Sequence, residues 1–364
     1  MDFAFSEEQQ MLRDSARSFL ESKFDADRVA ELAQSDEGWD ASSWTEIAEL
    51  GWVGLSVPED QGGAGFGFIE EAVLFEELGR ALYPGPYFST VALALPALNG
   101  TDVLADVLTG KARATFAWAE PSGPHRLSDL ENLSTKASGS NGSWTLSGEK
   151  AFVPDAAIAD VAVVAAAAPE GTGLFAAKLS DAEVRPASTM DTTRRLGSIS
   201  FNETPATLAV APDRASEILE KVRLRSLAAA ALEAVGVAQT ALDLAQDYVK
   251  ERKQFDKPIG AYQAVSHQVA DTYMETELAR SLAYWAAWCV AESDEQAAVA
   301  VAAAKSAAGE AAVHACERSI QVHGGIGFTW EHILHRYYKR AQWLAAFEGF
   351  DREHRKAVAA TILD

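Results

Sequence analysis

Apolar residues at helical spacing open the chain. Ser6, followed three residues later by Gln9, has the pattern of a capping box, a signature of a helix N-terminus. Leu12, Ala16 and Phe19 then recur on one helical face. The pattern predicts a first amphipathic helix directly after Ser6.

The same spacing predicts two more helices, over residues 43–50 and 68–82. Residues 58–65 between them read Pro-Glu-Asp-Gln-Gly-Gly-Ala-Gly and predict a loop. We therefore expect an N-terminal all-α domain over residues 1–112.

The pattern changes to short alternating runs after this point. Gly, Asn, Ser and Pro separate the runs, and Asn141-Gly142 is a hairpin-turn signal. The expected strands cover residues 115–118, 144–146, 161–166, 173–178 and 199–202. They predict a middle β domain over residues 113–212, built as a small barrel or sandwich.

Long alanine-rich helical patterns fill the rest of the chain. The expected helices cover residues 227–250, 263–292 and 295–322, with a fourth helical element over 331–363. Small residues favour close helix packing, so residues 213–364 predict a four-helix bundle. The fold class is therefore multidomain α+β, with helical, β and four-helix-bundle domains in that order.

Composition narrows the function. With 364 residues and 48% hydrophobic positions, the chain can form two or three domains. A formal net charge of −22 argues against nucleic acid and anionic membranes as partners. The acidic N-terminus lacks a signal-peptide core, and the apolar runs are shorter than a membrane span, so we expect a cytoplasmic protein.

Cysteine usage fits a reducing compartment. Cys289 and Cys316 both fall in helical patterns, and each is expected to pack in a core. No CxxC motif or His/Cys cluster is visible, so no metal site is expected.

Candidate chemistry concentrates near the C-terminus. Gly324-Gly325-Ile326-Gly327 would let a ligand approach the backbone closely. Glu348 stands between Phe347 and Gly349, where desolvation could raise its pKa and suit it to act as a general base. Without further information, a glycine turn and an ordinary surface glutamate explain the same residues.

Residues 321–329, Gln-Val-His-Gly-Gly-Ile-Gly-Phe-Thr, resemble the second signature of the acyl-CoA dehydrogenases. Phe347-Glu348-Gly349 falls where that family has Tyr-Glu-Gly, whose Glu abstracts the substrate α-proton. Ala117–Pro121 and Leu146–Lys150 resemble landmarks of the family's middle domain. The order of domains matches the family over the full chain.

Residues 252–260, Arg-Lys-Gln-Phe-Asp-Lys-Pro-Ile-Gly, resemble a family loop that reaches the FAD of the neighbouring subunit. The alternative is a charged helix end stopped by Pro258. The resemblance implies a homo-oligomer, dimer or tetramer, with FAD as cofactor. It implies these cofactor-binding residues: Arg252, Phe255, Gln263, Gln321, Gly324, Gly325, Ala119 and Val153.

The resemblance implies α,β-dehydrogenation of an acyl-CoA thioester to the trans-2-enoyl-CoA. Glu348 would take the α-proton while the β-hydrogen leaves as hydride to flavin N5. Electrons would then pass to an electron-transfer flavoprotein. Fatty-acid or steroid side-chain β-oxidation is the implied setting.

Several positions depart from the family pattern. Ala119 stands for the usual Thr, and Phe152-Val153-Pro154 for Trp-x-Thr/Ser, so two flavin contacts are lost. The Gly-Ser-Asp loop is degenerate over residues 122–126, and Phe350 and Arg352 replace a Thr and a Gln. Because Pro154 has no N–H, the amides of Val153 and Asp155 are the expected substitutes.

These departures resemble subunits of heteromeric acyl-CoA dehydrogenases that break down steroid side chains. A partner subunit, completed in a heterotetramer by a related chain, is therefore an alternative function. A flavin monooxygenase or oxidase on the same fold is another, although a monooxygenase has no need of Glu348 as an α-proton acceptor.

Other residues carry weaker signals. The turn at residues 191–195 would either position flavin or CoA, or be a solvated turn. Glu233 is a weak alternative base, because the position that some relatives use aligns with Ser226. His323 and His335 are expected to be capping or surface residues.

Overall fold

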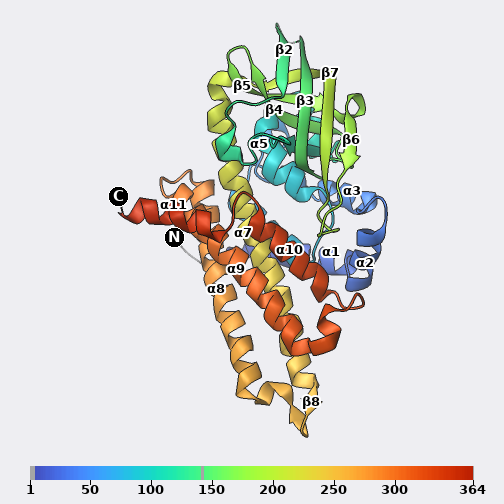
Figure 1. The fold of residues 1–364 in the computed structure, drawn as a ribbon, viewed down its shortest axis with the longest axis vertical. Coiled ribbons are helices and arrows are strands. Elements are labelled where there is room, and N and C mark those ends of the chain that lie inside the picture. The colour runs from blue at the N-terminus through green and yellow to red at the C-terminus, as the bar shows by residue number, and fades with distance from the viewer. Residues whose placement is uncertain (1–4, 141–142, 364) are drawn as a thin grey trace. The chain divides into compact units, whose positions relative to one another are not determined.

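The computed structural model describes residues 5–140 and 143–363, and the described chain packs as two units (Figure 1). The helical unit contains the segment ending at Gln34, Phe68–Tyr83 and the chain from Leu227 onward. The β unit contains Ser35–Gly67 and Pro84–Ser226. Domain boundaries after residues 112 and 212 remain predictions.

Helices make up most of the helical unit. Two short 3-10 helices and a hairpin of two-residue strands lie between some of them. They are α1 (Glu7–Lys23), α2 (Ala26–Gln34), α4 (Phe68–Arg80), most of α7 (Pro212–Glu251), β8 (Lys253–Gln254), β9 (Lys257–Pro258), η6 (Ile259–Ala261), α8 (Gln263–Ala291), α9 (Ala297–His323), η7 (Gly324–Phe328), α10 (Leu334–Ala346) and α11 (Asp351–Leu363).

The N-terminal helix begins as its sequence predicts. The Gln9 amide donates to Ser6 Oγ at 3.1 Å, and the Ser6 amide donates to Gln9 Oε1 at 3.0 Å. These two bonds satisfy donors that a helix start leaves without intrahelical partners. The predicted capping box is confirmed.

Two glycines allow α4 and α7 to approach closely. A Cβ on Gly79 would lie 2.2 Å from the Glu233 carbonyl oxygen, and one on Gly236 would lie 2.1 Å from that of Glu76. Only glycine therefore fits at these two positions of the crossing.

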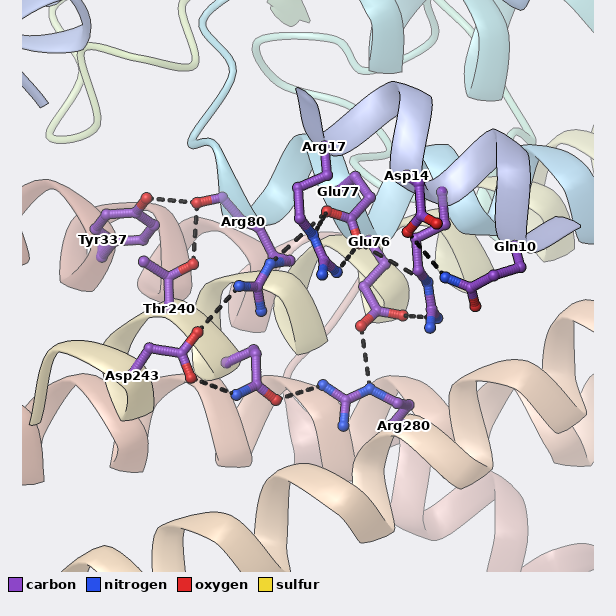
Figure 2. A network of polar contacts seen from close by, with 12 residues as sticks. Gln10, Asp14, Arg17, Glu76, Glu77, Arg80, Thr240, Asp243, Arg280 and Tyr337 are labelled. Carbon is purple, nitrogen blue, oxygen red and sulfur yellow. Dashed lines mark hydrogen bonds and ion pairs between the residues drawn. The ribbon is translucent and has the colours of Figure 1, made fainter. Parts of the chain in front are cut away.

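A network of charged side chains around two buried carboxylates joins four helices of this unit (Figure 2). The side chains of Glu76 and Glu77 on α4 are 4% and 1% exposed. Arg17 of α1 lies 2.7 Å from Glu77, and Arg280 of α8 lies 3.0 Å from Glu76. Arg80 links α4 to Asp243 of α7 at 3.0 Å. Buried carboxylates need such partners, so this network organises the bundle.

The β unit combines short helices with seven strands. Its helical elements are α3 (Ala41–Glu49), η1 (Trp52–Gly54), η2 (Glu59–Gln61), the π-helix η3 (Phe88–Ala94), α5 (Leu95–Leu98), α6 (Leu104–Leu108), η4 (Leu127–Asp129) and η5 (Leu179–Asp181). Its strands are β1 (Ala114–Ala117), β2 (Lys136–Ser140), β3 (Ser143–Pro154), β4 (Val161–Ala168), β5 (Gly171–Lys178), β6 (Glu183–Pro186) and β7 (Leu196–Val210).

Five of the strands close into a ring, so the middle region is a barrel. The order is β4-β2-β3-β7-β5, and β5 pairs back with β4. β1 joins β4 in parallel, whereas β6 joins β7 in the antiparallel direction. Alternate side chains such as Leu146, Val164 and Phe175 fill the interior.

Each of the five predicted strands overlaps an observed one. The sequence analysis missed β2 and β6, which are short and polar, and the Asn141-Gly142 turn lies outside the described residues. The predicted fourth helical element breaks into α10 and α11 at residues 347–350.

Within the described residues, one helix is long and apolar enough to span a membrane. It is α7, and 78% of its apolar window is buried, as in the core helix of a folded domain.

Candidate active site

The break between α10 and α11 carries the predicted base. Glu348 has φ of 55°, in the left-handed region, and Gly349 follows with φ of 112°. The left-handed conformation costs a non-glycine residue about 1–2 kcal/mol. Phe347 is buried and lies 5.1 Å from the Trp343 ring, while Glu348 is half-buried. The turn therefore places a half-buried carboxylate directly after a buried aromatic residue.

Two side chains from other helices contact this turn. Lys305 of α9 is 2% exposed, and its Nζ donates to the Ala345 carbonyl at 3.1 Å and lies 3.5 Å from that of Gly349. His354 Nε2 lies 3.1 Å from the same Gly349 oxygen. Burial lowers the pKa of Lys305 to about 7, although the charges of Glu348 and Asp351 oppose that shift.

The sequence analysis missed Lys305. Its signal is compositional: residues 297–304 have no charged side chain, and Lys305 interrupts an alanine-rich helix that is otherwise buried there. A lysine in such a helix needs a polar partner, because burying an unpaired charge is costly.

Residues 252–260, which resemble the family's FAD-contacting loop, form the β8–β9 hairpin. Phe255 and Asp256 occupy its turn with φ of 51° and 61°. Positive φ at both central residues is the pattern of a type I′ turn. Arg252 is exposed, and Phe255 is 88% exposed. Gln263 begins α8 beyond the hairpin and is exposed too.

The glycine signature forms the end of α9 and η7. Gly324 has φ of 66°, and a Cβ added to Gly324 or Gly325 would meet no atom within 4 Å. Gln321 is exposed beside them. The backbone here is open to a ligand.

The two histidines of this region are buried, so their assignment as surface residues is wrong, whereas the bond from His323 to the last turn of α9 agrees with a capping role. His323 is 6% exposed, stacks on Tyr248 with ring centroids 4.2 Å apart, and donates from Nδ1 to the Ser319 carbonyl at 2.7 Å. His335 is 9% exposed and meets the Trp330 ring edge-on at 4.7 Å. Apolar neighbours, which the local sequence spacing did not reveal, explain the difference.

The stacked pair brings the hairpin and the glycine signature to one end of the helical unit. Tyr248 is on α7 one turn before Arg252, and His323 directly precedes Gly324. Lys305, which contacts the Glu348 turn, is on α9 and stands 19 positions before Gly324. At a rise of 1.5 Å per residue, that is about 28 Å along the helix. Within one chain, these two groups are therefore well separated.

In the β unit, the two predicted cofactor residues offer no side-chain donor. Ala119 is 3% exposed, and its carbonyl accepts from the Ala151 amide at 2.9 Å. The Val153 side chain is 1% exposed and packs inside the barrel. The Asp155 amide, expected to be available, donates to the Arg195 carbonyl at 2.9 Å, so that expectation is wrong.

Beside Ala119 lies a buried ion pair. Lys150 Nζ is 2.9 Å from Glu120 Oε1, and Glu120 also accepts from Ser134 and Thr135 at 2.6–2.9 Å. Burial alone would raise the pKa of Glu120, but its hydrogen bonds outweigh burial and lower it to about 2. Burial lowers the pKa of Lys150 to about 8. This carboxylate is fully engaged and is not a base.

The weaker candidates also have partners. Glu233 is 2% exposed and lies 3.8 Å from Arg340, itself 1% exposed. Asp191 is buried and accepts from the amide and hydroxyl of Thr193 at 2.9 and 2.6 Å. A solvated turn at residues 191–195 is therefore wrong for Asp191, since its hydrogen bonds close the turn on itself.

Both cysteines are buried, as predicted. Among residues 5–140 and 143–363, no group of three or more His, Cys, Asp or Glu side chains is arranged to hold a metal ion.

Family models match most of the chain. The N-terminal, middle and C-terminal domains of acyl-CoA dehydrogenase match residues 6–103, 115–204 and 222–363. Acyl-CoA dehydrogenase IpdE2 of Mycobacterium tuberculosis is 34% identical over 349 residues, which are 95% of each chain.

Solved structures of similar proteins superpose on nearly the whole chain. A variant of the steroid ACAD Tcur3481-Tcur3483 superposes with a TM-score of 0.86 at 31% identity over 98% of each chain. The ChsE4-ChsE5 complex from Mycobacterium tuberculosis gives 0.88 at 25% identity, over 100% of this chain and 99% of that one. The chain belongs to the acyl-CoA dehydrogenase family and is an oxidoreductase that acts on acyl-CoA.

Proposed function

We propose that this chain catalyses FAD-dependent α,β-dehydrogenation of an acyl-CoA thioester to the trans-2-enoyl-CoA, with Glu348 as the base. The observation that carries the proposal is the turn between α10 and α11. Glu348 alone of its neighbours there combines a carboxylate, partial exposure and a strained left-handed backbone. Backbone strain of this kind clusters at active sites, where surrounding contacts maintain it.

Removal of the substrate α-proton needs little from the turn besides this carboxylate. The α-carbon of a thioester is weakly acidic, and a carboxylate oxygen of Glu348 takes its proton. Glu348 is half-buried and directly follows the buried Phe347, and partial removal of a carboxylate from water suits a general base. The hydrogen on the β-carbon leaves with its electron pair as that proton is removed.

The donor set of the helical unit fits an anionic dinucleotide. Arg252 offers a planar guanidinium that can pair with a diphosphate, and Gly324 and Gly325 leave their backbone open. When bound, FAD supplies the hydride acceptor at its N5 atom. Phe255 and Gln263, also exposed, and Gln321 would complete this side of the cofactor site.

The separation along α9 supports a site shared between subunits. Arg252 and Gly324 lie about 28 Å, at 1.5 Å per residue, from the level of Glu348 in their own chain. A flavin ring has to be next to the base, so the hairpin and glycine signature would serve a second copy. A dimer or tetramer follows, with electron-transfer flavoprotein as the electron acceptor.

The test of this function is Glu348→Gln. The amide has nearly the same shape but cannot take a proton, so acyl-CoA oxidation should fall by at least about a hundredfold, a typical contribution of general-base catalysis. Glu353→Gln, an exposed position on α11, is the matched control and should keep wild-type turnover. Wild-type activity in Glu348→Gln would refute the assignment of the base.

A second candidate function is a subunit of a heteromeric acyl-CoA dehydrogenase. Ala119, Pro154 and the engaged Asp155 amide favour it, because the β unit offers few donors to a flavin. A steroid side-chain substrate would accompany this function. Measuring flavin content of the purified chain, alone and with related chains, separates the two candidates. Stoichiometric flavin in the chain alone contradicts the heteromeric one.

A flavin monooxygenase on the same fold is disfavoured, whereas an oxidase stays an alternative. A monooxygenase has no use for an α-proton acceptor, and Glu348 occupies that position.

A further inference from the structure

We propose that Lys305 is a positioning residue for Glu348: its ammonium fixes the base-bearing turn through main-chain carbonyls and favours the ionised form of the carboxylate. The inference rests on the proposed function, since it assigns Glu348 as the base. It adds a residue outside the turn and outside the sequence motifs that identify the family.

The two carbonyls that Lys305 contacts lie on either side of Glu348 in the chain. Ala345 precedes Glu348 by three residues, and Gly349 follows it by one, so the contacts bracket the base. The Ala345 carbonyl belongs to the last turn of α10, where carbonyls have no intrahelical partner. A cation at a helix C-terminus is also favoured by the helix dipole. Lys305 therefore caps α10 from another helix.

The backbone between these two carbonyls is strained at Glu348. A left-handed Glu348 persists only if its surroundings enforce it. Lys305 contacts the chain on both sides, and His354 adds a donor to the Gly349 carbonyl at 3.1 Å. A carbonyl oxygen only accepts, so His354 Nε2 carries the hydrogen. The turn is thus held from α9 and α11 together.

Burying the charge of Lys305 costs free energy. Lys305 is 2% exposed in an alanine-rich helix, where a methionine would fill similar space without a charge. An apolar residue there could neither cap α10 nor act on Glu348. The position of the charge is therefore informative.

The charges around Lys305 identify its electrostatic partners. Lys305, Glu310, His314 and Asp351 line one small cavity of about 170 Å³. Glu310 is paired with Arg355 of α11, which also lies 3.8 Å from Asp351. The carboxylates whose charges act on Lys305 are Glu348 and Asp351.

The effect on the base has a definite sign. A positive charge nearby stabilises a carboxylate and lowers its pKa. The charge of Lys305, on which Glu348 and Asp351 both act, therefore favours the ionised form of Glu348. Asp351 carries a charge of the same sign as Glu348 and works in the opposite direction.

The primary experiment compares Lys305→Met, Lys305→Arg and the control Glu310→Gln. The readout is the pH dependence of kcat/KM for acyl-CoA oxidation with a dye as electron acceptor. Lys305→Met should move the acid limb up by about one pH unit, at the lower end of shifts caused by a nearby opposite charge. Lys305→Arg should keep most of the wild-type limb, and Glu310→Gln should leave it in place. An unmoved limb in folded Lys305→Met overturns the proposal.

A second readout does not need a loaded flavin. Hydrogen exchange of the peptide covering residues 345–351 should become about tenfold faster in Lys305→Met, if the lost contact is worth one typical hydrogen bond. Equal exchange in variant and wild type contradicts the positioning role.

Asp351→Asn keeps the idea falsifiable if Lys305→Met does not fold. It removes the competing carboxylate, so the acid limb should move to lower pH; an unmoved limb counts against the electrostatic link.

Glu348→Gln distinguishes failure of the proposed function from failure of the inference about Lys305. If it keeps activity, the proposed function fails. If it is inactive while Lys305→Met keeps the wild-type limb, only the inference about Lys305 fails.

Discussion

Each of the two units buries a lysine, and the partners of the two lysines differ. In the β unit, Lys150 is fully buried, and Glu120 is buried with it and saturated by hydrogen bonds. In the helical unit, Lys305 donates to carbonyls and leaves the half-buried Glu348 accessible. The first arrangement makes the carboxylate part of the structure, whereas under the proposed function the second would hold Glu348 in place and leave it able to react.

The units also differ in the motifs that they carry. Glu348, Arg252 and the glycine signature lie in the helical unit, whereas Ala119 and Pro154 in the β unit stand where the resemblance to the family leads us to expect hydroxyl groups. Under the proposed function, proton abstraction and flavin retention depend on different units. Variants in each unit test that separation.

The largest effect is expected from Lys150→Met. It leaves Glu120 buried without its cation, which costs about 3–5 kcal/mol of unfolding free energy. Urea unfolding monitored by tryptophan fluorescence should show it. Arg185→Gln is the control, because Arg185 and Glu183 are both exposed and such pairs contribute about 0–1 kcal/mol. A loss no larger than that of the control would show that the pair is not structural.

Acid should weaken the β unit through Glu120. Its folded pKa, about 2, lies below the ordinary value of 4.5, so the stability it contributes is present above 4.5 and is lost as pH falls towards 2. Unfolding midpoints measured across this window should fall more steeply in the wild type than in Glu120→Gln. Parallel slopes would contradict the role of this carboxylate.

The next largest effect is expected from Arg252→Ala. Losing one charge-assisted contact to a diphosphate costs on the order of 2 kcal/mol, or about thirtyfold in FAD affinity. If the hairpin serves a neighbouring subunit, oligomer mass should fall too. Lys253→Ala, on the adjacent exposed residue, is the matched control. Unchanged flavin affinity and unchanged mass would place the cofactor elsewhere.

The smallest effect is expected from Ala119→Thr. One restored neutral hydrogen bond contributes about 0.5–1.5 kcal/mol, up to about tenfold tighter FAD binding. Ala119→Val has nearly the same shape without the hydroxyl and should not tighten binding. Flavin titration of both variants decides the question. Equal affinities would show that the flavin does not lie next to residue 119.

The sequence predicted the parts of the fold that repeat a period. The capping box at Ser6 and the alanine-rich helices α8 and α9 appear at the expected places, whereas α7 begins at Pro212, 15 residues before its expected start. Strands β2 and β6 were missed because barrel pairing, rather than local alternation, makes them strands. The break at residues 347–350 was missed because side chains from other helices stabilise it.

The same limit applies to the candidate site. Glu348, Arg252 and Gly324 were identified because they stand in contiguous motifs. Lys305 was not, since its partners are carbonyls 40 and 44 positions further along the chain. The Asp155 amide shows the opposite error, because local reasoning left it free and the fold pairs it with Arg195.

The most direct test of Glu348 as the base measures proton abstraction without oxidation. An acyl-CoA with no hydrogen on its β-carbon, such as 3,3-dimethylbutyryl-CoA, can lose only its α-proton. Incubated with the flavin-loaded protein in D2O, it should gain deuterium at the α-carbon, measured by mass spectrometry. The account predicts that Glu348→Gln reduces this exchange to the rate without protein, while Glu353→Gln keeps it. Exchange at the wild-type rate in Glu348→Gln would contradict the account.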